Sequence, residues 1–156
     1  MASNRHLGRI VALQTLYEYE FRKRSGDKDA KLDEVLVKNI KPYEDSLGDV
    51  EFVQTLVTGV NKNLKDLDEI IQPMAPEWPL DQIPAIDRNI LRLGVFELIH
   101  LKDSVPPKVA INEAVELAKA FGSDNSSKFI NGVLGTAYRR YVEGGGESAE
   151  AEATAT

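Results

Sequence analysis

Residues 85–101, AIDRNILRLGVFELIHL, are apolar around most of the circumference of a helix. A helix with so wide an apolar surface needs neighbours on several sides, so this one belongs in the centre of a helical bundle. Nearly every other segment repeats its apolar residues at three or four positions, and few segments alternate as strands do. The sequence therefore predicts an all-α bundle of about six to seven helices.

Four prolines in twelve residues interrupt this pattern in the segment 73–84, PMAPEWPLDQIP. Such a segment cannot be helical throughout, so it predicts a boundary between helical halves at about 4–73 and 83–142. The tail 143–156 lacks large apolar residues and is expected to be disordered and acidic. Within the halves we expect helices over 4–23, over 32–40, from a cap at Asp49 to about residue 71, from Pro107 to Phe121, and from about residue 128 onwards.

The composition limits the classes of function. The chain has 156 residues, of which 42% are hydrophobic, which suffices for one domain with a core. It has no Cys, and its two histidines, His6 and His100, are far apart, so we expect no metal site and no cofactor. We find no run of about 20 apolar residues and no apolar signal segment at the start, and therefore expect a cytoplasmic protein.

The net charge of −6 conceals an uneven distribution. Residues 1–24 hold five basic and two acidic residues, and residues 105–142 hold five basic and three acidic ones, whereas the middle and the tail are acidic. If the two basic ends meet in the fold, they form a basic patch of the kind that binds phosphates. Scattered charges in contact with solvent are the alternative.

The last helix begins with Lys128 and Phe129, directly after the capping residues SDNSS. On a helical wheel Phe129 lies on the flank of the apolar stripe, and Gly132 lies beside it. An aromatic ring for a base, a cation for a phosphate and helix N–H groups together suit single-stranded nucleic acid. An aromatic residue in the first turn also commonly covers the edge of a core, and this alternative stays open.

The first helix repeats the combination of basic and apolar residues. Its apolar face is predicted from the spacing of Leu7, Ile10, Val11, Tyr17 and Phe21. Arg5 and Arg9 are expected to project from another side of the helix, where they can reach phosphates.

Several blocks, in order, resemble the NusB family of transcription antitermination factors: RIVALQTLYEYEF, FVQTLVTGV, IDRNILRLGVFEL and VPPKVAINEAVELAKAFGSDNSSKFINGVLG. The resemblance spans about residues 5–140. It implies an all-helical fold of two small subdomains and a non-catalytic role. It also implies that the protein binds boxA single-stranded RNA together with the ribosomal protein NusE. The complex would help RNA polymerase read through terminators in ribosomal RNA operons.

The resemblance also implies roles for individual residues. The family's arginine-rich start corresponds to Arg5, His6 and Arg9, and its RNA-contacting aromatic to Phe129, with Lys128 beside it. Asn125 stands where relatives often have an acid, which removes a repulsion from phosphate. The positions expected to face the protein partner are Tyr17 and Asp87, the latter at the solvent-open start of the central helix.

Two other classes of protein compete with this prediction. A catalytic protein is disfavoured, because no glycine-rich loop follows a strand and no nucleotide-binding α/β domain fits in the chain. A helical adaptor that keeps the protein partner but has lost RNA binding fits the small number of basic residues at the start. A homodimer stays open. The charged residues Arg88, Arg92 and Glu97 are expected to form ion pairs that orient the central helix.

Overall fold

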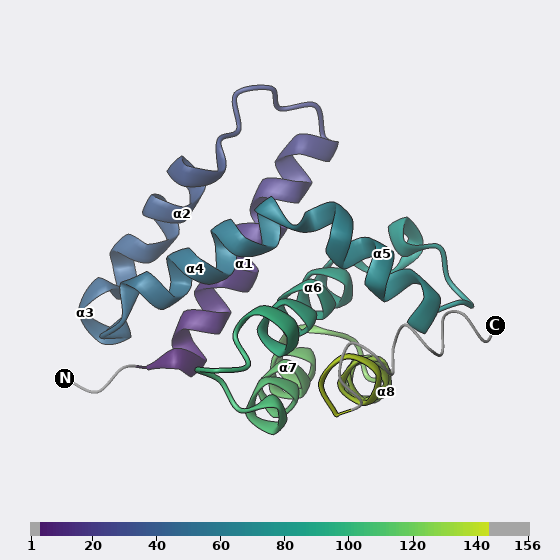
Figure 1. Ribbon diagram of the computed structural model, residues 1–156. Coiled ribbons are helices and arrows are strands. Elements are labelled where there is room, and N and C mark those ends of the chain that lie inside the picture. Colours follow the sequence, from purple (N-terminus) through teal and green to yellow (C-terminus); the bar gives the residue numbers. More distant parts are fainter. Residues whose placement is uncertain (1–3, 144–156) are drawn as a thin grey trace. The chain divides into compact units, whose positions relative to one another are not determined.

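The computed structural model describes residues 4–143, and within that range every regular element is helical (Figure 1). The predicted all-α fold is confirmed. Residues 144–156, most of the predicted tail, lie outside the described part. The elements are α1 (Arg5–Arg24), α2 (Leu32–Ile40), η1 (Lys41–Tyr43), α3 (Glu44–Leu47), α4 (Val50–Lys62), α5 (Leu64–Met74), η2 (Leu80–Gln82), α6 (Ala85–His100), α7 (Pro107–Phe121), α8 (Ser126–Tyr138) and the π-helical turn η3 (Arg139–Glu143).

Two compact units make up the chain, Met1–Asn63 and Leu64–Thr156. In the first, α1 packs against α2 and α4 (Figure 1). The helix begins at Asn4, whose side-chain oxygen accepts a hydrogen bond from the Leu7 amide at 3.0 Å. Its buried residues are Gly8, Arg9, Val11, Ala12, Leu13, Thr15 and Leu16.

The apolar face predicted for α1 is therefore partly wrong. Tyr17 exposes 37% of its surface and Phe21 exposes 60%, although both were expected to extend that face. Their rings stack on each other, with centroids 6.4 Å apart and planes inclined by 13°. The second half of α1 thus presents an aromatic pair to solvent instead of burying it.

The long helix predicted from Asp49 to about residue 71 is divided in the structure. Asp49 caps it as expected, accepting from the Phe52 amide at 3.1 Å. Asn63 is the C-cap of α4, where the backbone leaves the helical conformation at φ −105° and ψ 18°. Its side-chain amide donates to the Gly59 carbonyl at 2.8 Å, alongside the backbone N–H at 3.1 Å. The units divide at this residue, ahead of the proline-rich segment, so α5 belongs with the second unit.

The second unit is built around α6, which packs against α5, α7 and α8 (Figure 1). Every residue of α6 from Asp87 to Leu98 is buried, as its wide apolar surface predicts. Gly94 permits close packing, since a Cβ there would lie 2.7 Å from Leu134. The Arg92 guanidinium holds Asp68 of α5 through two hydrogen bonds of 2.8 and 2.9 Å. The ion pair predicted for Arg92 is therefore present, and it links α5 to the core helix.

Candidate nucleic-acid interface

Two cavities in the second unit share a wall made of Trp78 and Phe129. The first, here called the Asp87 cavity, has a volume of about 350 Å³ and is also lined by Pro84, Asp87, Asn125 and Ser126. The second, the Lys128 cavity, has about 280 Å³ and is also lined by Glu77, Lys128 and Gly132. Trp78 and Phe129 thus line each cavity, and aromatic residues at such a place suit the binding of flat, aromatic ligands.

The loop that carries Trp78 is held by the side chain of Gln72, at the end of α5. Its amide nitrogen donates to the Trp78 carbonyl at 2.7 Å, and its amide oxygen accepts from the Leu80 N–H at 2.8 Å. The Trp78 side chain nevertheless exposes 53% of its surface. Our sequence analysis missed Trp78, although a tryptophan among prolines is a signal for an exposed aromatic residue on a constrained loop.

Phe129 is half-buried in the first turn of α8, at the edge of both cavities. This is the flank position predicted by the helical wheel. Lys128 and Asn125 are exposed, and a Cβ added at Gly132 would meet nothing within 4 Å. Asn125 occupies the N-cap position of α8, forms no side-chain capping hydrogen bond and lines the Asp87 cavity.

The solvent exposure predicted for Asp87 is wrong. Only 5% of the residue is exposed, and its carboxylate faces Ser126 at the start of α8. The Ser126 hydroxyl donates to its Oδ2 at 3.0 Å, and the Ser126 oxygen accepts from the Ser123 amide at 2.9 Å. Burial raises the pKa of Asp87, and the Ser126 hydrogen bond offsets part of that rise. Asp87 therefore lines the cavity instead of lying open to solvent, and its role in partner binding stays a prediction.

In the first unit the predicted basic residues take different environments. Arg5 is half-buried, with its guanidinium 4.5 Å from the centre of the Phe52 ring and 4.0 Å from Asp49. His6 is exposed. Arg9 lies 5.1 Å from the same ring but exposes only 2% of its surface. The prediction that Arg9 projects into solvent is therefore wrong, because its side chain packs on Phe52.

The candidate residues thus fall into two groups in different units. The structure brings Asn125, Lys128, Phe129 and Asp87 together in the second unit, and Arg5, His6 and Arg9 together on the first turns of α1. Whether the two groups share one basic surface stays a prediction. None of the helices over residues 4–143 is long and apolar enough to cross a membrane, and no group of metal-ligating side chains occurs in the same range.

The fold and the paired cavities define an all-helical protein with an aromatic-walled surface. Residues 6–139 match the model of the NusB family, and the chain belongs to that family. It is 46% identical to transcription antitermination protein NusB of Chloroflexus aggregans over 91% of each chain. It is also 46% identical to the protein of the same name from Dehalococcoides mccartyi strain CBDB1, over 86% of this chain and 89% of that one.

Solved structures agree with this assignment. NusB of T. maritima superposes with a TM-score of 0.81 at 30% identity, covering 96% of this chain and 99% of that one. A structure of the antitermination factors NusB and NusE in complex with dsRNA contains a chain that matches with a TM-score of 0.74 at 28% identity. That match covers 88% of this chain and 97% of the other.

Proposed function

We propose that the protein is a transcription antitermination factor that binds boxA-type single-stranded RNA together with the ribosomal protein NusE. The complex promotes processive transcription of ribosomal RNA operons by RNA polymerase in the cytoplasm. The observation that carries this proposal is the exposed aromatic wall of Trp78 and Phe129 with Lys128 beside it, in a chain of the NusB family. The protein acts by binding and not by catalysis.

Each group at the wall suits one part of a single strand. The rings of Phe129 and Trp78 stack on bases, and the ammonium group of Lys128 contacts a phosphate. Arg5 and His6 supply further phosphate contacts from the start of α1, and both units act as one RNA-binding domain. Arg9 supports this surface indirectly, because its guanidinium covers the same Phe52 ring as Arg5.

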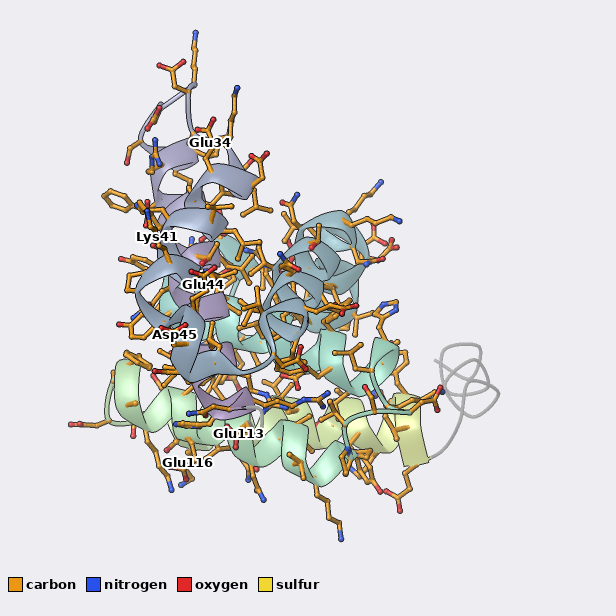
Figure 2. The ribbon with its side chains drawn as sticks, turned by 90° about the vertical axis from the view of Figure 1, so that its left-hand side faces the viewer. Glu34, Lys41, Glu44, Asp45, Glu113 and Glu116 are labelled. Atoms are coloured by element: carbon orange, nitrogen blue, oxygen red, sulfur yellow. The ribbon has the colours of Figure 1, made fainter. Side chains whose placement is uncertain are left out.

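The protein partner has a surface of its own in the first unit. Tyr17 and Phe21 form an exposed aromatic pair on α1, which suits the anchor of a protein interface. Figure 2 shows Glu34, Glu44 and Asp45 following one another along α2 and α3, with Lys41 between them, and all four are exposed. Such an acidic surface complements a basic ribosomal protein. The alternative, an adaptor without RNA binding, keeps only this contact.

The replacement Phe129→Ala distinguishes the RNA-binding factor from the adaptor that binds only NusE. It should lower the affinity for labelled boxA RNA by about 1–3 kcal/mol, because one stacking surface is lost. The melting temperature should change little, since the ring is only half-buried. Fluorescence anisotropy, with and without NusE, measures the affinity.

Phe121→Ala is the matched control, since Phe121 is an aromatic residue of the same unit that is 40% exposed and lines neither cavity. An equal loss of RNA affinity in both variants contradicts the assignment of Phe129. A protein that binds NusE but no RNA supports the adaptor.

A further inference from the structure

Asp49, the residue before α4, uses its two carboxylate oxygens for different contacts. Its Oδ1 accepts the hydrogen bond from the Phe52 amide at 3.1 Å and so caps the helix. Its Oδ2 lies 4.0 Å from Nη2 of Arg5, the first residue of α1. The same carboxylate therefore caps one helix and faces an arginine of another helix that is predicted to bind RNA.

The cap itself does not require a negative charge. Asparagine and aspartate are about equally good at this position, because either side chain offers an oxygen to the backbone amides. The first unit provides the comparison, since α1 is capped by Asn4, whose oxygen accepts from the Leu7 amide at 3.0 Å. The charge of Asp49 adds an interaction with the dipole of α4, which is weak where solvent has access. Its effect on Arg5 can therefore be separated from the cap.

The position of Arg5 does not depend on Asp49 alone. Its guanidinium lies 4.5 Å from the centre of the Phe52 ring, close enough for a cation–π contact. The backbone before it is tied to the end of α3, because the Asn4 N–H donates to the Leu47 carbonyl at 2.8 Å. An ion pair of 4.0 Å between side chains that are 37% and 34% exposed adds little to this arrangement. The carboxylate acts mainly by offsetting the positive charge of Arg5.

We propose that Asp49 is a counter-charge that competes with RNA phosphate for Arg5 and so lowers the affinity of the first unit for RNA. A phosphate that approaches Arg5 meets the carboxylate beside it, and the repulsion between the two anions opposes binding. This inference rests on the proposed RNA binding and adds to it a residue that limits the affinity.

The replacement Asp49→Asn removes the charge and keeps the cap. The amide oxygen takes the place of Oδ1, while the NH₂ group takes the place of Oδ2 beside Arg5 and can donate to a phosphate. The affinity for labelled boxA RNA should rise about two- to fivefold, since an exposed ion pair contributes up to about that factor. The slope of log affinity against log salt should steepen by up to about 0.7, the value for one phosphate on a single strand. Fluorescence anisotropy with saturating NusE and without NusE measures both quantities.

Two further variants show whether the gain acts through Arg5. Glu51→Gln removes the same charge from an exposed residue in the first turn of α4, and it should raise the affinity less than Asp49→Asn does. In the Arg5→Ala background, Asp49→Asn should change the affinity no more than Glu51→Gln does, because the cation for which Asp49 competes is absent. Circular dichroism measures whether the helical content is kept, and Asp49→Ser, which also keeps a capping oxygen, replaces Asp49→Asn if that variant does not fold.

The possible results are distinct. A gain of affinity in Asp49→Asn that disappears in the Arg5→Ala background supports the proposal, and a structural defect would not produce such a gain. A loss of affinity at unchanged helical content overturns it, because Asp49 then holds Arg5 in place for RNA. Equal gains in Asp49→Asn and Glu51→Gln overturn it in favour of a general effect of net charge. Unchanged affinity overturns it and leaves the proposed RNA binding intact, whereas both proposals fail if the unmodified protein does not bind the RNA.

Discussion

Arg5 and Arg9 occupy successive turns of α1 and contact the same ring, but they differ in burial. The side chain of Arg5 is 37% exposed, whereas only 2% of Arg9 is exposed. A half-exposed guanidinium can release counterions when it binds a phosphate, while a buried one contributes mainly through packing. The two residues are therefore expected to respond differently to the same replacement.

We expect Arg5→Ala to reduce the slope of log affinity against log salt by up to about one unit, with little change in melting temperature. We expect Arg9→Ala to lower the free energy of unfolding by about 1–3 kcal/mol, because it removes a buried side chain from the Phe52 ring. RNA titrations at several salt concentrations and urea denaturation measure the two effects. An unchanged slope in Arg5→Ala removes this residue from the RNA surface.

For single residues, the sequence predicts burial or exposure well only where the position on a helix determines it. The wheel placed Phe129 on the flank of α8 because the position of a residue on a helix follows from its number. It could not show that Asp87 is buried, since that depends on Ser126, which is 39 positions away along the chain. Trp78 lies on a loop, where no periodicity applies, and its position depends on hydrogen bonds to Gln72.

Helix α8 contributes Phe129 to the cavity wall and also has a glycine, Gly132, that lines the same cavity. Gly132 lies one turn after Lys128 and Phe129, lines the Lys128 cavity, and has open space where a side chain would begin. Glycine costs a helix about 1 kcal/mol relative to alanine, and packing within the chain does not require it at this position. We therefore expect a ligand to approach the backbone of α8 at Gly132.

Gly132→Ala should therefore stabilise the protein slightly and weaken RNA binding by about 1 kcal/mol or more, since the methyl group enters the cavity beside Phe129. Gly135→Ala is the matched control on the same helix. A Cβ there would make an ordinary contact of 3.5 Å with Arg139, and Gly135 lines neither cavity. Thermal melts and anisotropy titrations of both variants test this. Equal RNA affinity for the two would show that no nucleotide approaches Gly132.

The ends of helices were predictable where a nearby residue, such as a proline, determines them. The predicted ends of α2 at Leu32 and Ile40, and the start of α7 at Pro107, agree with the structure. The division between α4 and α5 was missed, because apolar residues continue with helical spacing across Asn63. The side-chain amide of Asn63 bonds back to the Gly59 carbonyl at the end of α4, but an asparagine inside a periodic segment is a weak signal.

At the scale of the whole molecule, the two units carry different candidate surfaces. The second holds the cavities, and the first holds both the aromatic pair of Tyr17 and Phe21 and the exposed acidic residues of α2 and α3. A protein that joins RNA to a ribosomal protein needs two such surfaces. A replacement in the surface for one ligand should then alter the affinity for the other ligand only when both ligands are present.

Tyr17→Ala tests this division of roles. It should lower the affinity for NusE by about 2 kcal/mol, because an exposed aromatic anchor is lost, and it should leave RNA binding by the isolated protein unchanged. In the presence of NusE, boxA binding should weaken, since the partner no longer contributes. Phe121→Ala is the control, with 40% exposure against 37% for Tyr17 but in the second unit. Calorimetric titration measures the partner affinity, and equal values for Tyr17→Ala and Phe121→Ala would place the NusE contact elsewhere on the molecule.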